Sequence, residues 1–322
     1  MKATHLIIIV LTITLVGTVV FGAFYLMKRN PAETLAYNIP ISITGPTTPT
    51  FKFAIYGEGA NKLARPMAVI VANNRIYVSD SVKEQVFIFE LDGTFVKAFG
   101  EPGDEPGQFR FPYGLAVDRD GNIYVADMKN QRIQVFDQDG QFLRVFERSD
   151  GEPFGSVAAL AIHDGQLYVT ELPGRISVFK LSGEKVLEIR DTGTDTALSF
   201  PNGIAVDGNG DIYVADSNNN RILVFDSEGK LVRSFDGSSE AGDSPIGFPR
   251  GIAISNKGVV FVVSSMAHKV YGLSREGERY FAFGTSGVQN DEFQYPNGIF
   301  IDSMGRIYIT DKGNQAIKVY AH

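Results

Sequence analysis

Two stretches of the chain have nearly the same sequence. FPYGLAVDRDGNIYVADMKNQRIQVF occupies residues 111–136, and FPNGIAVDGNGDIYVADSNNNRILVF occupies residues 200–225. Weaker copies align with these two when the proline near the start is used as a marker, which gives six units spaced 44 to 48 residues apart. The units start at Arg65-Pro66, Phe111-Pro112, Ser156-Val157, Phe200-Pro201, Phe248-Pro249 and Tyr295-Pro296. A fixed period in this range indicates stacked supersecondary units.

Each unit contains four short apolar segments. In the second unit they are GLAV (114–117), IYVA (123–126), RIQVF (132–136) and FLRVF (142–146). Asp-Gly pairs at 120–121 and 139–140 mark the turns between them. The second and third segments are apolar at successive positions, which is typical of strands buried on both faces. Four strands sandwiched between neighbouring copies form a propeller blade, so the sequence predicts an all-β, six-bladed β-propeller.

The two ends of the repeat region predict how the ring closes. The last unit stops at Tyr320, after its third strand, whereas the segment FKFAIYG (51–57) precedes the first unit and resembles the fourth strand FVKAFG (95–100). We expect this N-terminal strand to complete the sixth blade, which removes an exposed sheet edge. A small residue opens each first strand, as expected where strands crowd around an axis: Ala68, Gly114, Ala159, Gly203, Gly251 and Gly298.

An apolar run precedes the repeats. Leu6–Met27 is 22 residues without a charge, and at about 1.5 Å per residue it is long enough to span the hydrocarbon core of a bilayer. The run is longer than the apolar core of a cleaved signal peptide. The sequence therefore predicts a single-pass membrane protein, with an N-terminal transmembrane anchor in residues 1–29, a Pro/Thr-rich linker in residues 30–50 and the propeller in residues 51–322. We expect the propeller on the extracytoplasmic side, although the balanced charges around the run leave the opposite orientation open.

The propeller region is acidic. Residues 51–322 hold 27 lysines and arginines against 36 aspartates and glutamates, a net charge of −9. This balance argues against a nucleic acid as the main partner, because nucleic-acid binding depends on neutralising phosphates. The chain has no cysteine, which excludes disulfides and thiol chemistry.

The pattern FPxG-(I/L)AVD…IYVAD…N-x-R-I-x-VF resembles the NHL repeat, and the segment FGEPGDEPGQFRFP (99–112) is similar to the loop between blades in that family. The resemblance covers residues 51–322 and is weakest in the third unit. It implies a six-bladed propeller. It implies no single function, because family members include RNA binders, protein scaffolds and a few enzymes.

Acidic residues recur at two positions of the unit. The second strands end in Asp80, Asp127, Glu171, Asp216, Ser264 and Asp311, and the first strands of three units end in Asp118, Asp207 and Asp302. We interpret both sets as structural, since aspartate accepts hydrogen bonds from nearby backbone N–H groups. Arg132 and Arg221, five residues after the second-strand acids, are their expected partners. A ring of metal ligands is the alternative interpretation.

One position of the unit varies in a way that blade packing does not explain. It lies between the proline and the small residue, where the chain enters the innermost strand, and holds Met67, Tyr113, Ala158, Asn202, Arg250 and Asn297. We name these residues the funnel positions. In the fifth unit the loop SSMAHK (264–269) also departs from the repeat on the same face.

The candidate ligand-binding residues are therefore Arg250, Asn202, Asn297, Tyr113 and His268, since propellers bind ligands where few polar groups converge. A guanidinium beside amides that can donate hydrogen bonds favours a ligand with anionic or carbonyl groups. A solvated rim without a ligand is the alternative.

Two enzyme classes with related propellers were compared with this pattern. The amidating lyases hold zinc on histidines at the funnel positions, and here no funnel position is a histidine. The lactonase-like propellers hold calcium on an asparagine in a Pro-Asn-Gly motif, as at Asn202 and Asn297, but Arg250 between them would repel a cation. We therefore expect no metal or other cofactor, and a membrane-tethered binding or scaffold module for a protein, peptide or glycan. A propeller hydrolase or lyase is the alternative, and RNA binding is a weaker one.

Overall fold

A computed structural model describes residues 46–237 and 246–322, and residues Pro46–His322 form one compact unit. The predicted anchor at Leu6–Met27 and most of the predicted linker at 30–50 lie outside the described residues. Within the described ranges, no helix is long and apolar enough to cross a membrane. The anchor stays a prediction.

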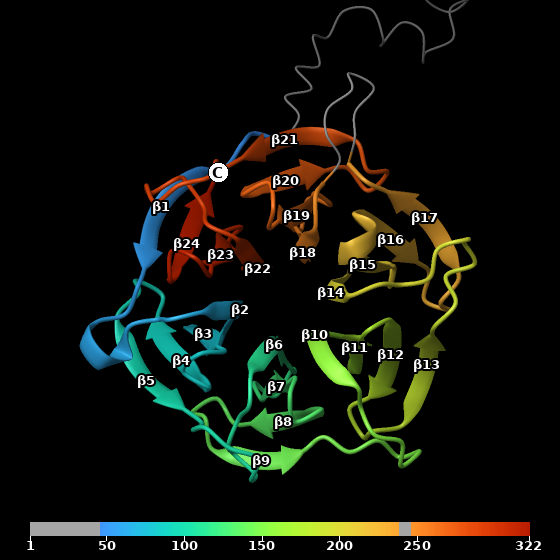
Figure 1. Ribbon diagram of the computed structural model, residues 1–322, viewed down its shortest axis with the longest axis horizontal. Coiled ribbons are helices and arrows are strands. Elements are labelled where there is room, and N and C mark those ends of the chain that lie inside the picture. The colour runs from blue at the N-terminus through green and yellow to red at the C-terminus, as the bar shows by residue number, and fades with distance from the viewer. Residues whose placement is uncertain (1–45, 238–245) are drawn as a thin grey trace, which may run out of the picture. The chain divides into compact units, whose positions relative to one another are not determined.

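The described residues form six antiparallel sheets of four strands, arranged as the blades of a ring (Figure 1). Blade one contains β2 (Pro66–Ala72), β3 (Arg75–Asp80), β4 (Gln85–Glu90) and β5 (Phe95–Phe99). Blade two contains β6 (Pro112–Val117), β7 (Ile123–Asp127), β8 (Arg132–Phe136) and β9 (Phe142–Val145). Blade three contains β10 (Ser156–His163), β11 (Gln166–Leu172), β12 (Arg175–Lys180) and β13 (Lys185–Ile189). Blade four contains β14 (Pro201–Val206), β15 (Ile212–Asp216), β16 (Arg221–Phe225) and β17 (Leu231–Phe235). Blade five contains β18 (Pro249–Ile254), β19 (Val260–Ser264), β20 (Lys269–Leu273) and β21 (Arg279–Phe283).

The sixth blade joins the two ends of the propeller, as the sequence predicts. It contains β22 (Pro296–Ile301), β23 (Ile307–Asp311), β24 (Ala316–Ala321) and, at its outer edge, β1 (Thr50–Ile55). Phe51 lies opposite Tyr320 and Ile55 lies opposite Ile317 in an antiparallel ladder. The pairing is visible in Figure 1, where the blue β1 lies beside the red β24. The six-bladed propeller with four-stranded blades is confirmed.

The hydrophobic core lies between neighbouring blades rather than at the centre of the ring. Between blades one and two, Phe99, Phe109 and Phe136 pack with ring centroids 4.8 to 6.5 Å apart. Each fully buried aromatic side chain stabilises the fold by about 1.5–3 kcal/mol. The apolar second and third strands of the repeat thus bury both faces, which explains their lack of alternation.

The first strands crowd around the axis and are irregular at their start. A Cβ atom added to Gly203 would lie 2.1 Å from the backbone oxygen of Arg250, and one added to Gly114 would lie 2.4 Å from that of Ala158. Every first strand also shifts register next to its funnel position, for example between Pro201 and Gly203. Such a bulge re-aims the side chain that it carries, and here it directs the funnel positions toward the axis.

The repeated acids have the structural role predicted for them. Asp127 accepts a hydrogen bond from the Arg110 backbone at 2.8 Å and pairs with Arg132 Nε at 3.0 Å. The equivalent acids bind the backbone or arginine of their own blades in the same way. At the other end of the blade, Asp118 accepts from the Asn122 backbone at 2.8 Å and closes a turn.

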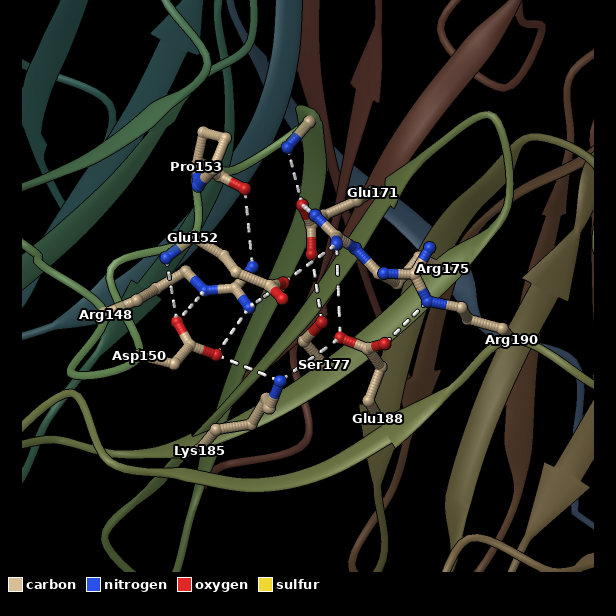
Figure 2. Close-up of polar contacts among 11 residues, drawn as sticks. Arg148, Asp150, Glu152, Pro153, Glu171, Arg175, Ser177, Lys185, Glu188 and Arg190 are labelled. Atoms are coloured by element: carbon tan, nitrogen blue, oxygen red, sulfur yellow. Dashed lines mark hydrogen bonds and ion pairs between the residues drawn. The ribbon is translucent and has the colours of Figure 1, made fainter.

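Blade three replaces the repeat pattern with a network of charges (Figure 2). Four acids and four bases take part: Arg148, Asp150, Glu152, Glu171, Arg175, Lys185, Glu188 and Arg190. Arg148 is buried between the rings of Phe154 and Phe179 and binds Asp150 with two hydrogen bonds of 2.8 and 3.0 Å. The ion pairs of this network connect the strands of the blade. Because four acids and four bases neutralise one another, the network has no net charge with which to attract a ligand.

Candidate functional site

Four of the five predicted site residues meet at the axis. The hydroxyl of Tyr113, from blade two, lies 3.4 Å from Asn202 Oδ1 in blade four and 3.3 Å from Asn297 Oδ1 in blade six. Arg250 Nη1, in blade five, donates to the same hydroxyl at 3.3 Å. Tyr113 therefore reaches across the ring and joins three blades on its far side. We name this set the axial network.

The axial network forms one end of a central cavity. The cavity measures about 270 Å³ and is lined by the first strands of all six blades, from Tyr113 and Asn297 at one end to His163 at the other. Tyr113 is buried, and its side chain lies at the end of the cavity that the axial network forms. The sequence position predicts convergence on the axis but does not predict how far a tyrosine reaches.

The asparagine amides use most of their N–H groups within the protein, where the sequence led us to expect them as donors to a ligand. Asn202 Nδ2 donates to the Phe200 backbone oxygen and to Ser217 Oγ, both at 2.8 Å, and Asn297 Nδ2 donates to the Met67 backbone oxygen at 2.8 Å. These bonds turn each Oδ1 toward the axis. The axial network therefore presents two hydrogen-bond acceptors there.

The face on which first strands begin and second strands end is here named the funnel face, and three cations from blades five, six and one lie near one another on it. The guanidinium of Arg250 stacks on the Phe248 ring at 4.5 Å, and its buried Nε has no hydrogen-bond partner among the described residues. Burial, together with the positive charges of Arg250 and Arg65, lowers the pKa of Lys312 to about 8. Within residues 46–237 and 246–322, no carboxylate forms an ion pair with any of the three. We name Arg65, Arg250 and Lys312 the cation cluster.

Sequence reasoning missed Arg65 and Lys312, although a signal exists. Lys312 follows the acid that ends its second strand, a position that varies between blades: Ser81, Met128, Leu172, Ser217, Ser265 and Lys312. Arg65 occupies the position before the proline, where four other blades have an aromatic residue. Both are unrepeated residues at repeated positions, which is the criterion that selected Arg250.

Apolar side chains cover the other half of the funnel face. Met67, Tyr113 and Ala158 are buried together, and Phe111, Met128 and Leu172 pack against them partly exposed. These residues come from blades one to three, whereas Arg250 and Lys312 come from blades five and six. The funnel face therefore has a mainly apolar half, in which Lys129 Nζ lies over the Phe111 ring at 5.5 Å, and a half that carries the cation cluster.

Four aromatic residues on this face have a left-handed backbone. The residue before the proline has φ of 75° at Phe111, 55° at Phe200, 54° at Phe248 and 52° at Tyr295. A bulky residue rarely adopts this region, and holding it there costs on the order of 1–3 kcal/mol. Phe200 is 42% exposed, so its burial in the free protein does not repay that cost in full.

His268 is not part of the axial network. Its Nδ1 accepts a hydrogen bond from the Tyr295 backbone at 3.1 Å, and the two rings lie 4.8 Å apart. Because Nδ1 acts as the acceptor, the neutral ring carries its proton on Nε2. No hydrogen bond in the described part of the chain joins His268 to the other four candidates. Its place in the site stays a prediction.

Within residues 46–237 and 246–322, no group of three or more His, Asp or Glu side chains is arranged to hold a metal ion. The expectation that the protein needs no metal or cofactor stays a prediction.

Comparisons with known proteins agree with the repeat and the ring. A family model described as a six-bladed β-propeller matches residues 59–168, and the NHL-repeat model matches residues 198–225 and 293–320. This chain is a six-bladed β-propeller that contains NHL repeats at residues 198–225 and 293–320. The fruit fly (Drosophila melanogaster) protein brain tumor is 33% identical to this NHL propeller over 187 residues, which is 57% of this chain and 14% of that protein. The Caenorhabditis elegans B-box type zinc finger protein ncl-1 is 64% identical over 31 residues, 10% of this chain and 4% of that protein. The chain thus spans a small fraction of these curated relatives.

Solved structures share the fold at low identity. A streptogramin B lyase is 18% identical with a TM-score of 0.58, covering 80% of this chain and 79% of that one. A virginiamycin B lyase from Staphylococcus aureus, solved in a catalytically inactive form with quinupristin, is 18% identical with a TM-score of 0.60, covering 82% and 83%. A Bacteroides thetaiotaomicron protein of unknown function is 17% identical with a TM-score of 0.64, covering 82% and 70%. At these identities the likeness extends to the fold alone.

Proposed function

We propose that this NHL propeller is a binding module that takes a protein or peptide partner on its funnel face. The observation that carries the proposal is the cation cluster, because three positive charges lie together and none of them forms an ion pair with a carboxylate among the described residues. Like charges gathered at a partly buried position lower stability unless an anion joins them. The partner therefore contributes an anionic group.

The strained aromatic residues support the same face. Proteins hold unfavourable backbone conformations at sites of function, where the surroundings impose them. Here they display Phe200 and Tyr295 to solvent beside the cations. Exposed aromatic residues and arginine are the side chains enriched at the centres of protein interfaces.

A lyase activity is the second candidate, and the shared fold of the streptogramin and virginiamycin B lyases favours it. His268 is the acid–base group on the funnel face that such a reaction would use. Its Nδ1 accepts from the Tyr295 backbone, so the neutral ring can donate a hydrogen bond from Nε2 but would have to release Nδ1 before it could accept a proton. Turnover separates the candidates: a lyase has a turnover that His268→Ala abolishes, whereas a binding module binds its partner without converting it.

We also propose that residues 6–27 anchor the propeller to a membrane, with the propeller outside the cytoplasm. Support comes from the length and apolarity of that segment and from the Pro/Thr-rich stretch that follows it. Protease added to intact cells or spheroplasts is expected to remove the propeller. Protection until the cells are lysed would reverse the orientation.

Two exposed methionines allow a matched test of the binding face. Met266, 61% exposed, lies in the loop between β19 and β20 on the funnel face, and Met304, 68% exposed, lies in a turn on the opposite face. A photoreactive amino acid placed at position 266 in cells is expected to form a covalent adduct with a partner, and the same group at position 304 is not. The adduct is expected to disappear with Arg250→Ala. Equal labelling from position 304 would contradict the proposal.

A further inference from the structure

The funnel face offers more than a positive charge, and its remaining groups restrict the ligand. The cation cluster lies in and next to blades five, six and one, and the apolar half made by Phe111, Met128 and Leu172 lies over blades two and three. Tyr113 joins the halves, because its ring packs with the apolar residues and its hydroxyl bonds Arg250. A ligand at the axis therefore touches cations on one side and apolar side chains on the other.

The polar atoms nearest the axis are of two kinds. Arg250 supplies donors, including a buried Nε without a partner in the described part of the chain. Asn202 and Asn297 present acceptors, because the hydrogen bonds that their Nδ2 groups donate turn each Oδ1 toward the axis. The Tyr113 hydroxyl lies 3.3 to 3.4 Å from these oxygens, longer than the usual 2.7–2.8 Å for O–H···O, so the contacts are weak. The site thus suits a ligand that has an anion and an N–H donor close together.

We propose that the funnel face captures the C-terminal residue of a peptide or protein chain that ends in an apolar side chain. The terminal carboxylate pairs with the cation cluster, the N–H of the last residue is accepted by Asn202 or Asn297 Oδ1, and the apolar side chain covers Met128 and Leu172. This proposal rests on the proposed binding function and names its ligand. A chain end of this kind brings a carboxylate, an N–H donor and an apolar group together within one residue.

Two other anionic ligands fit less well. A free amino acid carries an α-ammonium group next to its carboxylate, and the cation cluster repels it. A long polyanion such as a nucleic acid extends beyond the cluster over a propeller region with a net charge of −9, so repulsion grows along its length. A single carboxylate avoids both costs.

The test uses the full-length protein and fluorescent peptides labelled at their N-terminus. Three Gly/Ser-rich peptides are compared. Two end in phenylalanine, one with a free carboxylate and the other with a C-terminal amide. The third ends in aspartate with a free carboxylate. The free phenylalanine peptide is expected to bind at least about tenfold more tightly than the amide, since a charge-assisted hydrogen bond is lost. The aspartate peptide is expected to bind more weakly than the phenylalanine peptide. Lys312→Met and Met128→Asn are each expected to weaken binding, with melting temperature as the check on folding.

Several outcomes would overturn the inference. Equal affinity for the free and amidated peptides would show that the terminal carboxylate is not recognised. Tighter binding of single-stranded RNA than of any peptide would show that the ligand is a nucleic acid and not a peptide. If no peptide binds but the photo-crosslink at position 266 still depends on Arg250, the binding function stands and the C-terminal ligand is wrong. If the crosslink is absent as well, the proposed function fails with it.

Discussion

Arg250 in blade five donates a hydrogen bond of 3.3 Å to the hydroxyl of Tyr113 in blade two, across the axis of the ring. The two residues occupy the same position of the repeat, three blades apart. A bulge at the start of each first strand turns both side chains inward. Side chains from two opposite blades thus form a hydrogen bond across the axis.

The axial network predicts the effect of removing one hydroxyl. Tyr113→Phe takes away the acceptor of Arg250 and the donor that faces two buried amide oxygens, so we expect a loss of about 1 kcal/mol in the free energy of unfolding. Tyr213→Phe is the matched control, because the buried hydroxyl of Tyr213 has no partner within the described residues. Urea unfolding of both variants checks this. A Tyr113→Phe protein as stable as the control would show that the network contributes nothing to stability.

The crowding of the first strands predicts a difference between two glycines of blade four. Gly203→Ala places a methyl group 2.1 Å from the Arg250 backbone oxygen, and we expect it to cost about 1–3 kcal/mol, as overpacking does. A methyl group on Gly208 meets no atom within 4 Å, so Gly208→Ala is expected to be nearly neutral. Thermal unfolding compares the pair. Equal melting temperatures would contradict the close packing of blades around the axis.

Closure of the ring through β1 gives a third expected outcome. Removing Thr50–Ile55 exposes the edge of β24 and the side chains of Ile317 and Tyr320. We expect the deletion to lower the melting temperature and broaden the transition, because the sixth blade loses its outer strand. Deleting residues 40–45 is the length-matched control and is expected to leave unfolding unchanged. Identical transitions for the two deletions would exclude the closure.

The low pKa of Lys312, about 8 against an ordinary value of 10.5, sets opposite pH trends for stability and binding. Arg250 and Arg65 face it, and Asp311 precedes it in the chain. From pH 8 to 10.5 the unfolded chain holds the proton that the folded chain has lost, so the contribution of Lys312 to stability rises with pH. Affinity for an anionic ligand falls over the same range, because the site loses a charge.

Lys312→Met provides the reference for these trends, since tyrosines also titrate near pH 10. We expect the difference between wild type and this variant, in both unfolding free energy and ligand affinity, to change between pH 8 and 10.5. Differences that stay constant over that range would show that Lys312 has an ordinary pKa.

The sequence predicts the fold well because the blades share one pattern of apolar strands and turns. Strand order, closure by the N-terminal strand and the role of the repeated acids all follow from comparing the units with one another. Blade six shows how a repeat tolerates a change: Ala316 stands where Arg132 stands in blade two, and Lys318 supplies the charge, with its Nζ 3.3 Å from Asp311 Oδ2. Both residues of that pair are buried, so the compensation is visible only in three dimensions.

The candidate site could be predicted only in part. Arg250, Tyr113, Asn202 and Asn297 share a repeat position, and symmetry alone brings them to the axis. The direction of each amide could not be predicted, because it depends on hydrogen bonds from Asn202 to Ser217 and from Asn297 to the Met67 backbone in the next blade. The variation at the loop position of Lys312 was a signal that the sequence comparison did not use, and the low pKa of Lys312 depends on Arg250 and Arg65, which come from two other blades.

The most direct test of the central claim is the affinity of a captured partner for matched arginine variants. Arg250 lies on the funnel face, and Arg119, 81% exposed, lies in a turn on the opposite face. By titration calorimetry we expect Arg250→Ala to weaken binding by about 1.5–3 kcal/mol, as for a lost charge-assisted hydrogen bond. Arg250→Lys is expected to retain part of that binding free energy. Arg119→Ala is expected to bind like wild type. Equal affinities of wild type and Arg250→Ala would contradict the assignment of the funnel face as the binding site.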